Sequence, residues 1–132
     1  MKFLTFSLLL GIIAMYAEDK SAATATSAPA AEPKQFVIVL RLVPRLHDTK
    51  AWTKADLDAV GDHFKRLKAG TETGQVLLAG RTNEPGEKTF GLIVFTAPDE
   101  AAARAFMAAD PCVVAGVMTA ELHPYTVALR AH

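Results

Sequence analysis

His63 is the residue of this chain whose type and position best suit proton-transfer chemistry. An unperturbed imidazole has a pKa of about 6.5, so it can accept and donate protons near neutral pH. His63 follows Val60 by three residues and precedes Leu67 by four, which places it beside the apolar face of a predicted helix. The position suits a general acid or base. The alternative is a histidine at the rim of the core whose hydrogen bonds are satisfied.

A second group of reactive side chains surrounds an Asp-Pro step. Asp110 directly precedes Pro111, a pair typical of a helix N-cap followed by proline in the first turn. Cys112 lies in that turn, where a helix N-terminus lowers a thiol pKa and favours a nucleophile. The alternative for Cys112 is a small buried hydrophobe. Since it is the single cysteine, an intramolecular disulfide, a Cys-pair redox site and a zinc ribbon are excluded.

Five further residues are candidates for binding a substrate. Arg41 interrupts an apolar strand and would hold an anionic group; alternatively it forms an ion pair or extends to the sheet edge. Arg81 is a weaker candidate of the same kind, beside Gly80, which permits close approach of the backbone. His123 and Tyr125 share one face of the last strand, where they would line the same pocket or simply pack on an edge strand.

Several classes of partner and cofactor are not expected. The four histidines show no ligand spacing such as H-x-x-x-H, so we expect no metal site, and no nucleotide-binding motif indicates a cofactor. The formal net charge is zero and there is no cluster of Lys and Arg, so we expect no nucleic-acid partner. We expect a small-molecule ligand.

The N-terminus has the layout of a secretory signal peptide. A positive charge at Lys2 is followed by an apolar run over 3–13 and then by polar residues. The run is shorter than the roughly 20 apolar residues that span a bilayer. We expect cleavage after Ala17, or alternatively near Ala23, and a periplasmic or secreted protein without a stable membrane anchor after cleavage. The alternative is an uncleaved anchor or a buried segment.

The rest of the chain divides into a linker and one domain. Residues 18–34 contain an Ala-, Thr-, Ser- and Pro-rich tract without apolar periodicity, which predicts a flexible linker. Residues 35–130 form the predicted domain. Hydrophobic residues make up 51% of the chain, which is enough for a packed core.

The periodicity of the domain predicts an α+β fold. Apolar runs predict strands at 36–43, 75–81, 89–96 and within 117–129. Helices are predicted after Thr53, with an apolar face formed by Leu57, Val60, Phe64 and Leu67, and after Thr96. A short helical turn follows at 110–116. The order strand-helix-strand-strand-helix-strand is that of a ferredoxin-like βαββαβ fold.

The two central strands are apolar on both faces, whereas two helices can cover only one face of the sheet. We therefore expect a homodimer whose sheets pack face to face. The alternative is a monomer in which the linker or the C-terminus covers the sheet.

The chain resembles the YciI-like (YCII-related) family over about residues 36–127. The resemblance rests on a series of short motifs in order: His63-Phe64-x-x-Leu67, Leu77-Leu78-Ala79-Gly80, Phe90-Gly91, Ala109-Asp110-Pro111, Ala115-Gly116-Val117 and Pro124-Tyr125. Where the family pattern has a proline after Ala-Gly, this chain has Arg81.

The resemblance implies a dimeric α+β barrel built from the ferredoxin-like fold. It also implies a catalytic pair made of His63 and Asp110, in which the carboxylate orients the imidazole. Some members of the family carry out elimination chemistry, so the resemblance implies an enzyme of the isomerase or lyase type. The competing expectations are a module that binds a small ligand without turnover and a purely structural dimer.

Overall fold

The computed structural model describes residues 32–131. The expected signal peptide (1–17) and nearly all of the expected linker (18–34) lie outside the described residues. The first strand begins at Lys34, one residue before the expected start of the domain. Within 32–131, the structure contains no helix of the length and apolar character needed to cross a membrane.

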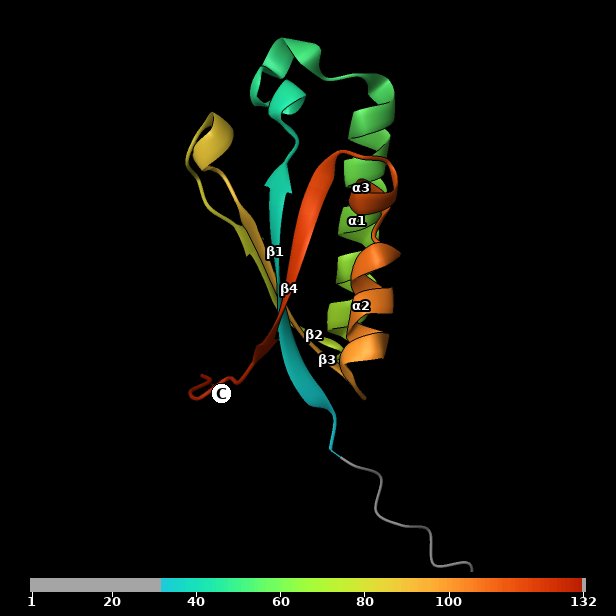
Figure 1. Ribbon diagram of the computed structural model, residues 1–132, viewed down its shortest axis with the longest axis vertical. Coiled ribbons are helices and arrows are strands. Elements are labelled where there is room, and N and C mark those ends of the chain that lie inside the picture. The colour runs from blue at the N-terminus through green and yellow to red at the C-terminus, as the bar shows by residue number, and fades with distance from the viewer. Residues whose placement is uncertain (1–31, 132) are drawn as a thin grey trace, which may run out of the picture. The chain divides into compact units, whose positions relative to one another are not determined.

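A four-stranded antiparallel sheet carries helices on one face (Figure 1). Its strands lie in the order β2-β3-β1-β4, so the first and third strands are central, as predicted. The described elements, in chain order, are β1 (Lys34–Leu42), η1 (Pro44–His47), η2 (Thr49–Ala51), α1 (Lys54–Glu72), β2 (Val76–Arg81), η3 (Gly86–Lys88), β3 (Gly91–Ala97), α2 (Glu100–Ala108), α3 (Pro111–Val114) and β4 (Met118–Tyr125). This α+β architecture is compatible with the ferredoxin-like arrangement.

The core lies between the sheet and the helices. Phe36, Ile38 and Leu40 alternate along β1 and are at most 4% exposed, because they point toward the helices. Phe95 of β3 joins them, with its ring centroid 4.6 Å from that of Phe106 on α2. Fully burying a side chain of this size stabilises a fold by about 1.5–3 kcal/mol, so these residues hold α1 and α2 on one face of the sheet.

Helix α1 begins with the predicted capping box. The Thr53 hydroxyl accepts from the Asp56 amide, and the Asp56 carboxylate accepts from the Thr53 amide at 2.8 Å. Arg45 of η1 adds a two-pronged ion pair to the same carboxylate, with one contact of 3.0 Å. At the other end, Gly70 approaches β2 so closely that a Cβ there would lie 2.6 Å from Val76 Cγ2. The helix is thus fixed at both ends.

The face that α1 buries differs from the predicted one. Of the four predicted apolar residues only Leu67 is buried, whereas Leu57 and Phe64 are 59% and 67% exposed. The buried positions are Asp56, Ala59, Leu67 and Gly70. Ala59 and Gly70 are small, and the Asp56 carboxylate is bonded to the start of the helix, so this face packs closely against the domain. The larger side chains point toward a groove described below. A second difference concerns α2, whose N-cap is Asp99 and not Thr96, because β3 continues to Ala97.

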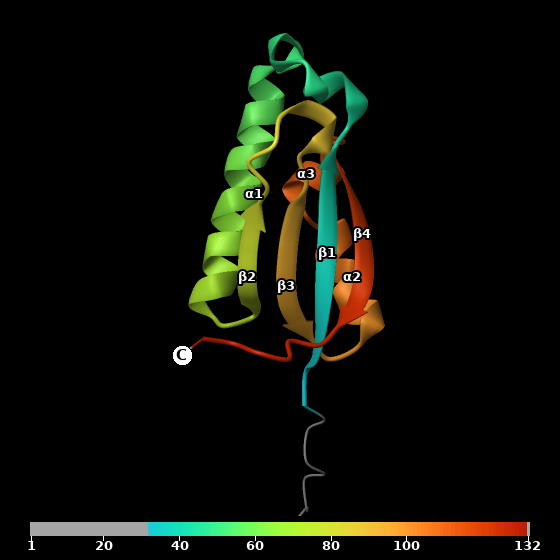
Figure 2. The ribbon, with the colours of Figure 1, turned by 90° about the vertical axis from the view of Figure 1, so that its left-hand side faces the viewer.

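The other face of the sheet carries no helix (Figure 2). The strand register places Val37, Val39, Leu92 and Leu78 on this face, and Leu92 and Leu78 are 37% and 60% exposed. After β4 the chain turns across the lower end of this face (Figure 2), where the Val127 amide donates to Gln35 Oε1 at 2.6 Å. The C-terminal segment therefore leaves most of this apolar surface uncovered.

Candidate active site

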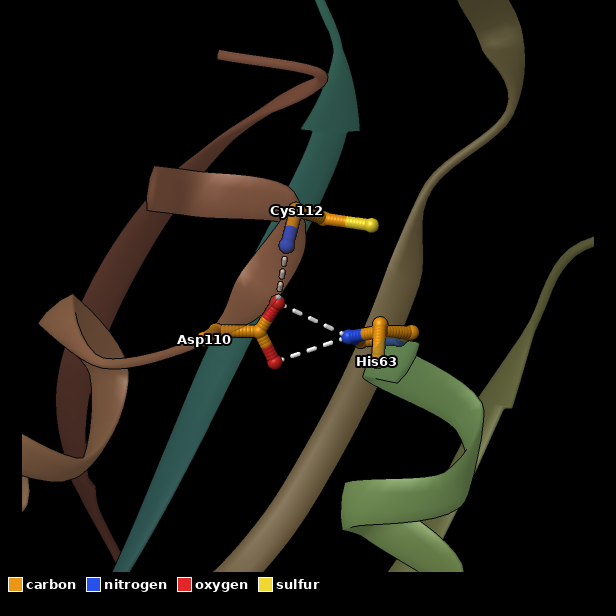
Figure 3. A group of neighbouring side chains, drawn as sticks. All are labelled: His63, Asp110 and Cys112. Atoms are coloured by element: carbon orange, nitrogen blue, oxygen red, sulfur yellow. Dashed lines mark hydrogen bonds and ion pairs between the residues drawn. The ribbon is translucent and has the colours of Figure 1, made fainter. Parts of the chain in front are cut away.

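The two residues of the expected pair lie within hydrogen-bonding distance. His63 in the middle of α1 and Asp110 at the start of α3 point toward each other (Figure 3). His63 Nδ1 lies 2.7 Å from Asp110 Oδ2 and 2.9 Å from Oδ1. The side chains of His63 and Asp110 are 13% and 3% exposed. A carboxylate only accepts hydrogen bonds, so the imidazole donates from Nδ1.

The position of the Asp110 carboxylate follows from its second role as the N-cap of α3. Asp110 Oδ1 accepts from the Cys112 amide at 2.9 Å, and Pro111 supplies the first helical position, as predicted. Gly116, with a φ of 68° that suits glycine, ends the helical turn. The same local sequence that starts α3 thus fixes the carboxylate that meets His63.

Arg66 is a neighbour of the pair that the sequence does not identify, because it falls outside the predicted apolar face of α1. Its guanidinium donates to the Phe106 carbonyl at 2.7 Å and to Asp110 Oδ2 at 3.4 Å. It also lies over the Phe106 ring, 4.1 Å from the centroid. Its spacing in the sequence could have identified it: Arg66 follows His63 by three residues, which places both on the same side of a helix.

These contacts determine the ionisation of Asp110. Burial alone raises the pKa of the Asp110 carboxyl. The hydrogen bond and charge of His63, the Cys112 amide and the charge of Arg66 act in the opposite direction and prevail, so the pKa lies below its ordinary value. The carboxylate is therefore ionised at neutral pH and able to stabilise a positive imidazolium.

Cys112 packs against the pair but differs from it chemically. Its side chain is fully buried in a cluster with Leu46, Ala59 and Val117. Burial, and secondarily the charge of Asp110, raises the pKa of the Cys112 thiol to about 12. The thiol is therefore protonated at physiological pH, which supports the interpretation as a buried hydrophobe over that as a nucleophile.

His63, Asp110 and Cys112 also form a group whose potential metal-ligand atoms lie within 4.8 Å of one another. The separation of His63 Nδ1 and the Asp110 carboxylate is that of a direct hydrogen bond, so in this structure the two groups bind each other.

A groove of about 1000 Å³ opens beside His63, between α1 and the ends of β2 and β3. Most of its wall is apolar, including Trp52, Leu57, Val60 and Phe64. His63 Nε2 makes no hydrogen bond to another described residue. Because every buried polar side-chain atom of residues 32–131 has a hydrogen-bond partner, Nε2 is not fully buried. Because His63 lines the groove, Nε2 is the imidazole nitrogen available to a bound molecule.

Two of the five candidate binding residues line this groove, and three lie elsewhere. Gly80 and Arg81 are part of its wall. Arg41 is on the opposite face of the sheet, where its guanidinium lies 5.3 Å from the centroid of the Phe90 ring. His123 and Tyr125 are exposed on that same face of β4, which is an edge strand as predicted. Within one chain, the structure does not bring these three residues to His63.

The fold and the site together define a class: a small antiparallel α+β domain with a histidine–carboxylate pair at the wall of an apolar groove. The family model of the YCII-related domain matches residues 35–122. The chain belongs to this family, so the resemblance inferred from its motifs is confirmed. A search of curated proteins found no match.

Proposed function

We propose that this protein is a small-molecule enzyme of the isomerase or lyase type, in which His63 and Asp110 form an acid–base pair. The observation that supports this most is the 2.7 Å contact between His63 Nδ1 and Asp110 Oδ2, combined with the free Nε2 at the groove. A histidine with one nitrogen held by a carboxylate presents the lone pair of the other nitrogen in a defined direction.

The proposed chemistry begins with proton abstraction from a carbon atom next to an electron-withdrawing group. His63 Nε2 takes the proton, and the Asp110 carboxylate stabilises the imidazolium that results. Return of that proton to a different atom of the substrate completes an isomerisation. Expulsion of a leaving group from the neighbouring carbon completes an elimination, and solvent then removes the proton from Nε2. Neither route requires a cofactor.

Hydrogen–deuterium exchange at carbon tests this proposal even while the substrate is unidentified. The full-length protein is incubated in D₂O with a library of small carbonyl compounds and enol-forming aromatics, and deuterium at carbon is followed by NMR. We expect exchange of at least one compound with the wild type and with His47→Gln, a matched control in η1, and none above background with His63→Gln. Equal exchange by wild type and His63→Gln would contradict the role of His63 as the base, whereas no exchange of any compound by the wild type would indicate a binding module without turnover.

We also propose that two copies form a dimer through the uncovered sheet face, as in a dimeric α+β barrel. Exposed Leu78 and Leu92 and the adjacent Val37 and Val39 support this, because monomers rarely leave such a surface in water. Arg41, His123 and Tyr125 would then lie at the interface. Light scattering should give twice the chain mass, and Leu78→Lys should halve it, whereas Leu129→Lys in the exposed C-terminal segment should not. A wild-type monomer would contradict the proposal.

The N-terminal sequence supports export of the protein to the periplasm or the medium. Cell fractionation tests this: the mature protein should be found outside the cytoplasm and should start near residue 18 or 24. Recovery of the intact chain in the cytoplasm would contradict export.

A further inference from the structure

The groove beside His63 is lined by side chains that a soluble protein normally covers. Phe64 and Leu57, two turns apart on one face of α1, are 67% and 59% exposed, although both are large and apolar. Trp52 and Val60 extend the same wall. Small-molecule sites are typically apolar cavities of about 300–1,000 Å³ with a few placed polar groups, and the volume of about 1000 Å³ falls at the upper end of that range.

The charged side chains in this wall are cationic. The groove is lined by Arg81 and Lys68 in addition to His63, and no Asp or Glu of the described residues takes part. The whole chain is balanced, with 14 basic and 14 acidic residues. The positive character is therefore a property of the groove and not of the protein as a whole.

Arg81 is the better placed of the two cations. In the strand register Arg81 pairs with Gly91, which pairs with Leu40, and Leu40 points toward the helices. Arg81 therefore belongs to the face of the sheet on which the groove and His63 lie. Lys68 Nζ already has an acidic neighbour, since it lies 4.0 Å from Glu72 Oε1. The structure shows no acidic partner for Arg81 among residues 32–131.

We infer that the groove binds a molecule with an aromatic or similarly apolar body and one anionic group, such as an arylcarboxylate. The anionic group is held by Arg81, and the apolar body covers Phe64 and Leu57. Resting on the proposed function, this arrangement places a carbon of the ligand beside His63 Nε2. An arginine fork matches a carboxylate in two hydrogen bonds, which explains a cation at an otherwise apolar wall.

Calorimetric titration with three aromatic compounds of similar size tests this inference: 1-naphthoate, the neutral 1-naphthamide and the cationic 1-naphthylmethylammonium. We expect naphthoate to bind about tenfold more tightly than naphthamide, the range of a charged hydrogen bond, and the cation to bind most weakly. Arg81→Gln should abolish the preference for the anion without changing naphthamide binding. Phe64→Ala should weaken both. Arg104→Gln, which removes an exposed arginine of α2, should change neither.

The outcomes also separate this inference from the proposed function. Because binding requires Arg81 and Phe64, His63→Gln should retain the affinity for naphthoate, whereas deuterium exchange should be lost. Naphthoate binding without any exchange activity would support the inferred class of ligand and contradict the proposed enzymatic activity. An absence of preference for the anion would overturn the ligand class. Failure of all three compounds to bind at millimolar concentration would also overturn it.

Discussion

His63 Nδ1 lies 2.7 Å from Asp110 Oδ2, although 47 residues separate the two along the chain. Two independent structural requirements produce this contact. The length and caps of α1 fix the position of His63 relative to the sheet. The start of α3 fixes the Asp110 carboxylate through its hydrogen bond from the Cys112 amide. Local sequence therefore orients each side chain, and the fold brings the two together.

Replacing Asp110 by Asn separates the two roles of this residue. The amide oxygen can still cap α3, so the melting temperature should fall less than in Asp110→Ala, which loses the cap as well. The negative charge that stabilises the imidazolium is lost, and deuterium exchange should slow by about 10²–10⁴-fold, the usual contribution of general acid–base catalysis. Thermal unfolding and exchange rates measure the two effects. Wild-type exchange rates in Asp110→Asn would show that the carboxylate only caps the helix.

Removing Arg66 should change the ionisation of Asp110. The charge of Arg66 contributes to the low pKa of the Asp110 carboxyl, so Arg66→Gln should raise that pKa toward its ordinary value. Carbon-13 NMR of the carboxyl group as a function of pH measures the change. Arg104→Gln is the matched control, since Arg104 is exposed and pairs with Glu100. A carboxyl titration that is identical in wild type and Arg66→Gln would contradict the contribution of the Arg66 charge to the low pKa of Asp110.

Acid should destabilise the domain through Asp56. The hydrogen bonds of Arg45, and then those of the Thr53 amide and hydroxyl, hold the pKa of the Asp56 carboxyl well below its usual range. A carboxylate with a lowered pKa in the folded state contributes stability above its unfolded pKa of about 3.9, and this contribution is lost as the pH falls below that value.

Urea unfolding between pH 7 and pH 2 measures this dependence. The midpoint of the wild type should fall steeply below about pH 4. Asp56→Asn should be less stable at pH 7 and should show a flatter profile. Asp58→Asn should match the wild type, because Asp58 is an exposed partner of Lys54. Parallel profiles for wild type and Asp56→Asn would show that Asp56 does not cause the loss of stability in acid.

Cys112 should behave as a packing residue. With a pKa of about 12 and a fully buried side chain, its thiol should react with a disulfide reagent at pH 8 only as fast as the domain opens. Cys112→Ala should keep deuterium exchange and lose stability by about 1 kcal/mol, as for a small cavity. Fast labelling of the native protein, or loss of deuterium exchange in Cys112→Ala, would instead indicate that Cys112 acts as a nucleophile.

The sequence predicted the elements that have strong local signals. The Thr53 capping box, the Asp110-Pro111 helix start and the apolar central strands are all local patterns, and each is present in the structure. It failed for the buried face of α1, because periodicity identifies large apolar residues but not how closely a helix packs. The helix packs through Ala59 and Gly70, and Phe64 remains exposed at the groove.

The candidate site was predictable only in part for a related reason. The family resemblance supplied the partner of His63, whereas the contact of Arg66 with Asp110 arises from tertiary packing between α1 and the end of α2. Arg41 and Arg81 had similar sequence signals, a cation in or beside an apolar strand, with the weaker signal at Arg81. The strand register alone places them on opposite faces of the sheet.

The central claim is that Asp110 holds the His63 proton on Nδ1 and leaves the lone pair of Nε2 for a substrate. Long-range ¹H–¹⁵N NMR of His63 in the neutral state tests this most directly, because the two nitrogens give different shifts when protonated. We predict a protonated Nδ1 and an unprotonated Nε2 in the wild type, and loss of this preference in Asp110→Ala. A wild-type spectrum with the proton on Nε2 would contradict the proposed acid–base pair.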